Sequence, residues 1–181
     1  AAPHRRLQTG DIDVELGRFE RAVHSAESQL QELEQRASQD GLQQVQTLLG
    51  AHAALLRDKA LFSATKERIS QQRQNAEWAL QDTLRSLKQL FDRVDGDYFK
   101  ERRSDLDTVG DRLLRNLTGD LEDPLVELPE DAVVVAYDLS PADVVALARS
   151  SARAFVTESG GPTSHTAILA RALGVPCVLE V

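Results

Sequence analysis

Cysteine, methionine and aromatic residues are scarce in this chain. Its 181 residues include one cysteine, no methionine and 4% aromatic residues. A single cysteine excludes a disulfide within the chain and a zinc site built mainly from cysteines, and it fits a reducing compartment. No apolar run approaches the roughly 18 residues that a membrane-spanning helix needs, and the first residues lack the apolar core of a signal peptide. We therefore expect a cytoplasmic protein, without a membrane segment, whose N-terminus has been trimmed so that the chain is a fragment.

Basic residues are also in deficit. The chain has 21 lysines and arginines against 29 aspartates and glutamates, which gives a net charge of −8. This balance disfavours nucleic acid and anionic membranes as partners. The apolar content, 41%, is ordinary for a soluble globular protein and exceeds that of disordered chains.

The first part of the chain has a helical pattern. Apolar residues recur there at steps of three and four, which predicts amphipathic helices. Four apolar stripes run from Leu16 to Ala37, from Leu42 to Leu56, from Ile69 to Val94 and from Leu106 to Leu117. Ser63 is the expected cap of the long third helix, and Gly119 is the expected C-terminal cap of the fourth. Four long helices joined by short breaks predict packed antiparallel hairpins.

The pattern changes after residues 120–131, which contain two prolines and six acidic residues. Residues 132–137 form an unbroken apolar run, typical of a strand buried on both faces. Ser140 and Pro141 have the order of an N-cap and a first helical residue. Further strands are expected at residues 154–157 and 177–179, and further helix at residues 141–149 and 164–173. Alternating strands and helices predict a parallel α/β layer, to which we expect strands outside this chain to be added.

The predicted fold is thus an α-helical hairpin bundle followed by a partial α/β domain. The expected divisions are an N-terminal segment at residues 1–10, an all-helical subdomain at residues 11–119, a linker at residues 120–131 and an incomplete α/β domain at residues 132–181.

One glycine-rich string, SGGPTSHTAILAR at residues 159–171, ends a predicted strand and opens a helix. Glycines permit positive φ and close backbone approach, and the first amides of a helix favour a phosphate or another anion. His165 lies in the first turn, where a neutral imidazole is a candidate nucleophile toward phosphorus. The residues expected to support the phosphate are Gly160, Gly161, Thr163, Ser164 and Thr166.

A lone histidine near a helix start is more often a capping or surface residue. The other histidines, at positions 4, 24 and 52, all lie in the helical part or before it. The sequence shows neither a serine–histidine–acid triad nor a cluster of metal ligands. The complete string between a strand and a helix is therefore the more specific signal.

The string GGPTSHTAILARALGVP resembles the phosphohistidine signature of Enzyme I of the phosphoenolpyruvate–sugar phosphotransferase system. Pyruvate phosphate dikinase and phosphoenolpyruvate synthase have related swivelling domains. Three other segments favour Enzyme I. Residues 48–61 resemble the helix with which Enzyme I binds the carrier HPr, and residues 95–117 resemble its last helical segment. Residues 136–144 resemble a strand and turn of the same family.

The resemblance implies that His165 takes a phosphoryl group from phosphoenolpyruvate and passes it to a histidine of HPr or an HPr-like carrier. The matching positions of the docking helix are Leu48, His52, Leu55, Asp58 and Leu61. Core packing of the leucines, and a solvated or hydrogen-bonded His52, are the structural alternatives. These residues do not resemble the barrel domain that binds phosphoenolpyruvate and Mg²⁺ in the family. We therefore expect a monomeric fragment that is limited to reversible exchange with phospho-HPr. The resemblance implies that the complete enzyme is a homodimer.

The chain departs from the family pattern at two places. Gly50, Lys59 and Ala60 stand where glutamates are expected, which favours a nitrogen-system paralogue of HPr or a more apolar interface. Val144 replaces a threonine that orients the active histidine in many relatives. Two alternatives stay open: the swivelling domain of a dikinase-like enzyme, and an interaction protein whose swivelling domain is inactive.

Overall fold

The computed structural model describes residues 4–39, 41–93, 97–119, 128–161 and 164–181, and for residues 97–101 the backbone only. Over these residues the chain forms seven α-helices, one short 3-10 helix and three strands. The chain divides into two compact units. One contains Ala1–Glu32 with Gly50–Leu121, and the other contains Leu33–Leu49 with Glu122–Val181.

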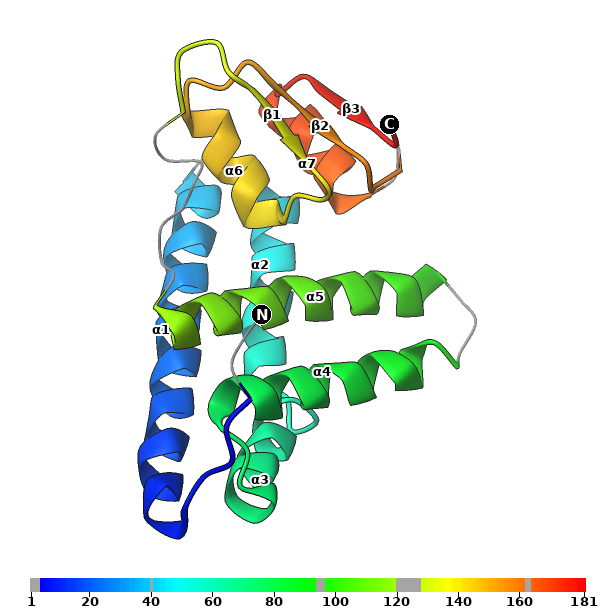
Figure 1. Ribbon diagram of the computed structural model, residues 1–181. Coiled ribbons are helices and arrows are strands. Elements are labelled where there is room, and N and C mark those ends of the chain that lie inside the picture. Colours follow the sequence, from blue (N-terminus) through cyan, green and yellow to red (C-terminus); the bar gives the residue numbers. More distant parts are fainter. Residues whose placement is uncertain (1–3, 40, 94–96, 120–127, 162–163) are drawn as a thin grey trace. The chain divides into compact units, whose positions relative to one another are not determined.

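The helical part follows the predicted periodicity with one exception. Its elements are η1 (Thr9–Asp11), α1 (Ile12–Gln39), α2 (Gln43–Leu56), α3 (Phe62–Gln72), α4 (Ala76–Phe91) and α5 (Asp97–Thr118). Helices α4 and α5 run side by side as a hairpin (Figure 1). Gly110 of α5 permits their close approach, because a Cβ there would lie 2.5 Å from a methyl of Leu84.

The prediction of one long third helix is wrong. The chain breaks at Arg73, which adopts a left-handed conformation with φ of 56°. The N-terminal segment takes the backbone groups at this break, since the amide of Leu7 donates to the carbonyl of Arg73 at 2.7 Å and the amide of Asn75 donates to the carbonyl of Arg5 at 3.0 Å. The apolar stripe continues across the break, which conceals it in the sequence.

The expected helix caps have mixed outcomes. Ser63 is the second residue of α3 and does not cap it. The N-cap position is taken by Leu61, and no side chain makes a capping hydrogen bond there. Ser140 caps α6 as predicted, and its hydroxyl accepts from the amide of Asp143 at 3.2 Å. Gly119 has the positive φ, 75°, that suits the end of α5.

The core of the helical unit is aliphatic with one phenylalanine. Its largest apolar side chains with less than 2% exposure are Phe19, Leu30, Leu56, Leu61, Ile69, Leu80 and Leu113. These residues come from all five helices or the turn before α3, so burying them fixes the bundle through roughly 2 kcal/mol of transfer free energy for each leucine.

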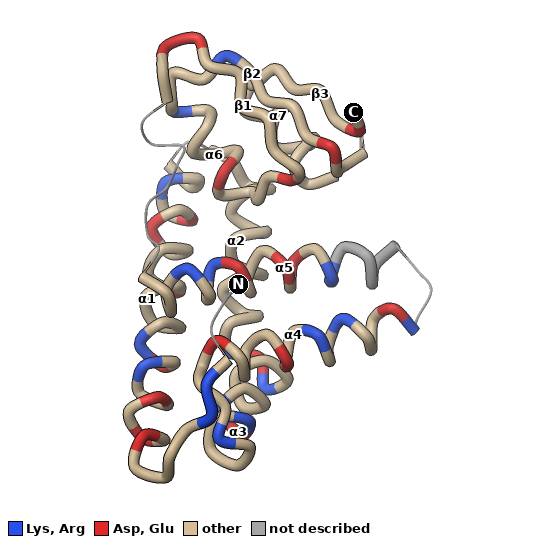
Figure 2. Tube along the Cα trace, viewed as in Figure 1, with Lys and Arg blue, Asp and Glu red and all other residues tan. Residues whose placement is uncertain are grey.

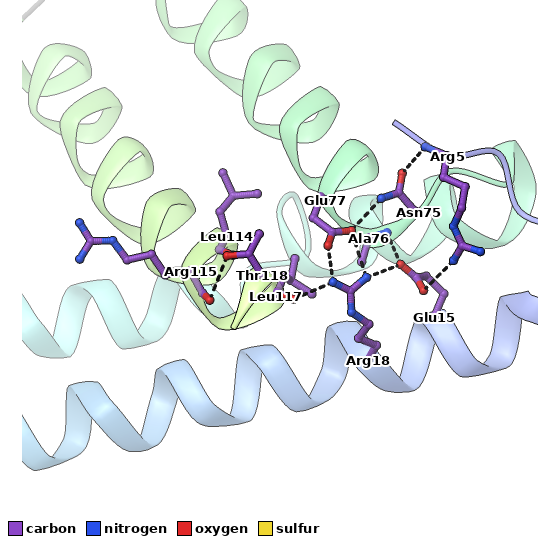
Figure 3. A network of polar contacts seen from close by, with 10 residues as sticks. All are labelled: Arg5, Glu15, Arg18, Asn75, Ala76, Glu77, Leu114, Arg115, Leu117 and Thr118. Carbon is purple, nitrogen blue, oxygen red and sulfur yellow. Dashed lines mark hydrogen bonds and ion pairs between the residues drawn. The ribbon is translucent and has the colours of Figure 1, made fainter. Parts of the chain in front are cut away.

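A polar network centred on Arg18 joins α1, α4 and the end of α5 (Figure 3). Its guanidinium donates to Glu15 at 2.9 Å, to both carboxylate oxygens of Glu77, and to the carbonyl of Leu117 at 2.6 Å. The hydrogen bond to Glu77 raises the pKa of Arg18. Burial raises the pKa of Glu77, but hydrogen bonds from Arg18, the backbone and Asn75 together hold that pKa below its ordinary value.

The same network holds the N-terminal segment. Glu15 accepts from the amide of Ala76 at 2.8 Å and pairs with Arg5 at 3.7 Å. Asn75 accepts from the amide of Arg5 at 2.9 Å. These bonds anchor the segment before α1 to the start of α4.

The α/β unit contains three parallel strands in the order β1-β2-β3 (Figure 1). Its elements are β1 (Val133–Ala136), α6 (Pro141–Arg149), β2 (Ala154–Thr157), α7 (His165–Leu173) and β3 (Cys177–Leu179). Val134 pairs with Phe155, and Phe155 pairs with Cys177 across the sheet. Phe155 is fully buried, so this face of the sheet packs against the core.

The prediction that β1 is buried on both faces is wrong. Val133 and Val135 are 55% and 76% exposed, and Val178 of β3 is exposed on the same face. Helices α6 and α7 contact each other and form one layer. Among the described residues, this layer covers the face of the sheet that carries Phe155 and leaves the other face exposed. None of the described helices is long and apolar enough to cross a membrane.

Candidate functional site

The predicted site lies between the end of β2 and the start of α7. Backbone hydrogen bonds join this loop to the end of β1, since the amide of Glu158 donates to Ala136 at 3.3 Å and that of Ser159 donates to Tyr137 at 2.9 Å. Thr157 is fully buried, and its hydroxyl donates to the carbonyl of Ser159 at 2.7 Å. These bonds fix the strand end from which the glycine turn begins.

The turn itself requires glycine at its first position. Gly160 has φ of 99°, and a Cβ on it would lie 3.2 Å from the Ser164 hydroxyl oxygen. The carboxylate of Glu180 lies 3.2 Å from the place of a Cβ on Gly161. Thr163, predicted to support a phosphate, lies outside the described residues. The turn closes with a 2.9 Å hydrogen bond from the amide of Ser164 to the carbonyl of Gly161.

His165 is the first residue of α7 and is half-buried. Ser164 is the N-cap, and its hydroxyl accepts from the amide of Ala167 at 3.2 Å. The amides of His165 and Thr166 lie in the first turn, where backbone N–H groups have no carbonyl acceptor within the helix, and they form the positive end of the helix dipole. The predicted nucleophile is therefore placed among groups that favour a bound anion.

Thr166, which is predicted to support the phosphate, uses its hydroxyl for a hydrogen bond within the protein. Its side chain is buried, and its hydroxyl donates to the carbonyl of Leu139 at 2.9 Å. A threonine hydroxyl has one proton to donate, so this donor is already used within the protein.

Two of the five predicted partner-binding residues lie in the core. His52 is 2% exposed, and its Nε2 lies 3.0 Å from Oδ1 of Asp105 on α5. Leu61 is 1% exposed. Burial of this depth excludes direct contact of these two side chains with a partner in this conformation.

Asp105 is a residue that the sequence patterns did not single out. It precedes Leu106 and lies one turn before Val109, both of which are buried. An acidic residue on the apolar face of a helix requires a polar partner, and that pattern was the available signal for the contact with His52.

The other three predicted contact residues remain accessible. Leu48 and Leu55 of α2 are half-buried, and Asp58 is exposed just after the helix. Figure 2 shows that α2 carries no charged residue, as its sequence QQVQTLLGAHAALL confirms. The accessible surface of this helix therefore consists of apolar and uncharged polar groups. The carboxylate of Asp58 accepts from the amide of Ala60 at 2.7 Å.

No group of three or more histidine, cysteine, aspartate or glutamate side chains comes together in the part of the chain that the structure describes. These residues therefore do not fit the Mg²⁺ site that the family resemblance implies for a complete enzyme. The chemistry available at the site is that of an imidazole, backbone amides and hydroxyl groups.

Comparison with known families assigns both parts of the chain. The family model described as PEP-utilising enzyme, N-terminal, matches residues 1–102. The model described as PEP-utilising enzyme, mobile domain, matches residues 128–181, which include the glycine turn and His165. The chain belongs to the family of PEP-utilising enzymes.

Within that family the matched relatives are phosphoenolpyruvate-protein phosphotransferases. The protein of Bacillus sp. (strain S) is 36% identical over 93% of this chain and 29% of its own length. The protein of Listeria monocytogenes is 34% identical over 97% of this chain and 31% of its own length. The protein of Cupriavidus necator is 33% identical over 98% of this chain and 32% of its own length. The chain thus spans about a third of the length of these relatives.

Two solved structures share the fold. A solution NMR structure of an Enzyme I protein superposes with a TM-score of 0.79 at 27% identity, covering 99% of this chain and 73% of that one. The N-terminal domain of Enzyme 1 – Nitrogen superposes with a TM-score of 0.71 at 25% identity, covering 98% and 71%. The predicted helical bundle with a small parallel α/β part, and the resemblance to Enzyme I, are both confirmed.

Proposed function

We propose that this chain is the phosphohistidine-bearing and partner-docking part of a phosphoenolpyruvate-protein phosphotransferase. His165 would carry a phosphoryl group on its way from phosphoenolpyruvate to a histidine of HPr or an HPr-like carrier. The observation that carries the proposal is the position of His165, at the first residue of α7 directly after the glycine turn, within the segment that matches the mobile domain.

The transfer step needs one free imidazole nitrogen. A ring nitrogen of neutral His165, Nε2 by resemblance to the family, donates its lone pair to phosphorus and forms the N–P bond. The bond from phosphorus to the donor breaks, and the donor, an imidazole of the carrier or the enolate of pyruvate, keeps the electron pair. The half-buried ring would remain within reach of a second protein.

The surrounding backbone would stabilise the charge of the transferred group. The amides at the start of α7 and the helix dipole act on the equatorial oxygens, where negative charge accumulates during phosphoryl transfer. Gly160 and the cap at Ser164 hold those amides in place before the phosphoryl group arrives. This preorganisation requires no metal ion from this chain.

The reaction with phosphoenolpyruvate would need regions that the relatives have outside the part matched by this chain. The chain corresponds to 29% to 32% of its relatives' length, and we assign the phosphoenolpyruvate site, with its Mg²⁺, to the remainder of such an enzyme. The residues present suffice for reversible exchange with a phosphorylated carrier, because that step needs only two histidines and their alignment.

The docking surface would be the accessible side of α2. We keep Leu48, Leu55 and Asp58 as contact residues, and we exclude His52 and Leu61 because they are buried. Because α2 itself has no charged residue, docking there would rely mainly on apolar burial, with Asp58 after the helix as a single charged contact, and would depend weakly on salt.

A nitrogen-system carrier is the second candidate partner. The likeness to the N-terminal domain of Enzyme 1 – Nitrogen favours it, and so does the uncharged α2. The scarcity of cysteine supports the cytoplasm as the compartment of either exchange.

The test is exchange with phospho-HPr, which is prepared separately and purified away from the enzyme used to phosphorylate it. We expect the parent chain to gain one acid-labile phosphoryl group by intact-mass spectrometry, and His165→Ala to gain none while still binding HPr. A folded parent chain that binds HPr and gains no phosphoryl group would contradict the proposal.

A further inference from the structure

Thr166 differs from the other buried or terminal helical threonines in its hydrogen bond. The hydroxyls of Thr65, Thr83 and Thr118 donate to the carbonyl four residues earlier in the chain, at 2.7, 2.8 and 3.0 Å. That local bond is the usual one for a helical threonine. Thr166 is the second residue of α7 and has no helical carbonyl four residues earlier; its hydroxyl donates to Leu139, 27 residues away in sequence, at 2.9 Å. Its bond therefore joins two segments, whereas the others stay within one turn.

The acceptor is itself held firmly. Leu139 is buried, and its amide donates to the carboxylate of Asp138 at 2.8 Å. The next residue, Ser140, forms a reciprocal capping box with Asp143, at 2.8 and 3.2 Å. The carbonyl of Leu139 thus belongs to the fixed start of α6, and the hydrogen bond of Thr166 ties the first turn of α7 to it.

Two buried side chains of α6 offer no such polar support. Val144 and Val145 are buried there, and valine has neither a donor nor an acceptor in its side chain. The two helices pack against each other, so apolar contact sets their separation. The hydrogen bond of Thr166 adds a directional contact that restrains the rotation of the first turn of α7.

His165 lies directly before Thr166 and shares a peptide plane with it. It is the first residue of the helix, where backbone conformation is least constrained by intrahelical bonds. Locking Thr166 to Leu139 therefore fixes the direction in which the His165 side chain leaves the backbone. Phosphoryl transfer demands that the attacking nitrogen be aligned with phosphorus, and small misalignments reduce its rate strongly.

We propose that Thr166 is a positioning residue for phosphoryl transfer, and that its hydrogen bond to the Leu139 carbonyl holds the His165 imidazole in the direction of attack. This inference rests on the proposed function of His165. It assigns Thr166 no contact with the phosphoryl group, because its proton is donated elsewhere.

Two matched pairs of side chains isolate the hydrogen bond. Thr166→Val keeps the shape and removes the hydroxyl, so it is compared with the parent chain. Thr166→Ser and Thr166→Ala both lose the methyl group and differ only in the hydroxyl. Each variant is first shown by circular dichroism to be folded at the assay temperature, and the serine–alanine pair remains informative if the valine variant is not folded.

The rate of exchange is measured over a range of phospho-HPr concentrations, so that the limiting rate and the apparent affinity are obtained separately. We expect the limiting rate to fall about tenfold in Thr166→Val and Thr166→Ala, with the affinity changed less than about twofold because docking lies elsewhere. Thr166→Ser should return the rate to within about threefold of the parent.

A second readout follows the ring itself. The ¹⁵N resonances of the His165 imidazole report the tautomer and the surroundings of the ring at one fixed pH, without any phosphoryl donor. We expect the valine and alanine variants to shift these resonances and the serine variant to reproduce those of the parent chain.

The outcomes separate this inference from the proposed function. No phosphorylation of the parent chain would overturn the proposed function, whatever the variants do. A phosphorylated parent with equal limiting rates in Thr166→Val would overturn the inference alone. So would equally slow serine and alanine variants, since the hydroxyl would then be irrelevant.

Discussion

Replacement of Arg18 by methionine should destabilise the helical unit by about 2 kcal/mol. The change keeps most of the aliphatic side chain but removes every hydrogen bond of the guanidinium (Figure 3). It takes the Arg18 donor from the carboxylates of Glu15 and Glu77, each 3% exposed, and from the carbonyl of Leu117. Removing one partner of a buried ion pair costs about 3–5 kcal/mol.

Two features of the site reduce that figure. The side chain of Arg18 is 34% exposed, so solvent screens part of the interaction. The carboxylates also keep other donors, since Ala76 remains bonded to Glu15 and Asn75 to Glu77. About 2 kcal/mol is therefore the expected loss at a pH of about 7.

The assay is urea unfolding followed by the fluorescence of Trp78, the sole tryptophan, which neighbours Glu77 on α4. The matched control is Arg85→Met, because Arg85 pairs with Asp82 across one turn and is 63% exposed. We expect less than about 0.5 kcal/mol from this control. Equal losses in the two variants would refute the reasoning.

The same network predicts a dependence on pH. The pKa of Glu77 is lowered in the folded chain from its ordinary value of 4.5. The unfolded chain therefore binds the proton more readily, and the stabilisation is complete above pH of about 4.5 and is lost as pH falls through the lower folded value. In Arg18→Met the free energy of unfolding should fall less steeply over this acid range. An unchanged slope would contradict the assignment.

Three other changes follow from the structure. Arg73→Gly should raise the free energy of unfolding by about 0.5–1 kcal/mol, because glycine tolerates the φ of 56° at the end of α3; a loss in urea unfolding would contradict this. Gly160→Ala should slow phosphorylation of His165 by phospho-HPr and destabilise the α/β unit by about 1–2 kcal/mol, since φ there is 99°, and parent-like exchange would argue against the turn's role. Leu55→Asp should weaken HPr binding at least about tenfold in calorimetry, because it places a charge on an uncharged helix, with Asp58→Asn as the milder control; unchanged binding would exclude this face.

Periodicity was sufficient for most of the helical part. The stripe from Leu16 to Ala37 predicted α1, and the stripe from Leu106 to Leu117 predicted most of α5. The break at Arg73 could not be predicted in this way, because Ile69 and Ala76 are spaced by one heptad and keep the stripe in phase. The break depends on the N-terminal segment that bonds there, which is a tertiary effect.

The exposure of one face of the sheet was not predictable from the sequence either. A continuous run of apolar residues at 132–137 is typical of burial on both faces, but burial depends on which elements cover the strand. Here Val135 is exposed while its neighbour Val134 is not. Patterns within one segment do not contain that information.

The candidate site was predictable in position and less so in detail. The glycine turn, the Ser164 cap and His165 at the helix start all follow from a local string. The bond from Thr166 to Leu139 and the contact of His52 with Asp105 join residues far apart in sequence. Residue type predicts that such buried groups need partners, but the fold determines which partners they have.

The central claim is that one particular histidine carries the phosphoryl group. The most direct measurement is to incubate the chain with phospho-HPr and locate the N–P bond by NMR of the ¹⁵N-labelled imidazole rings. The four histidines, at positions 4, 24, 52 and 165, give separate signals. We predict phosphorus coupling on His165 alone. Coupling on any other histidine, or on none while HPr binds, would contradict the account.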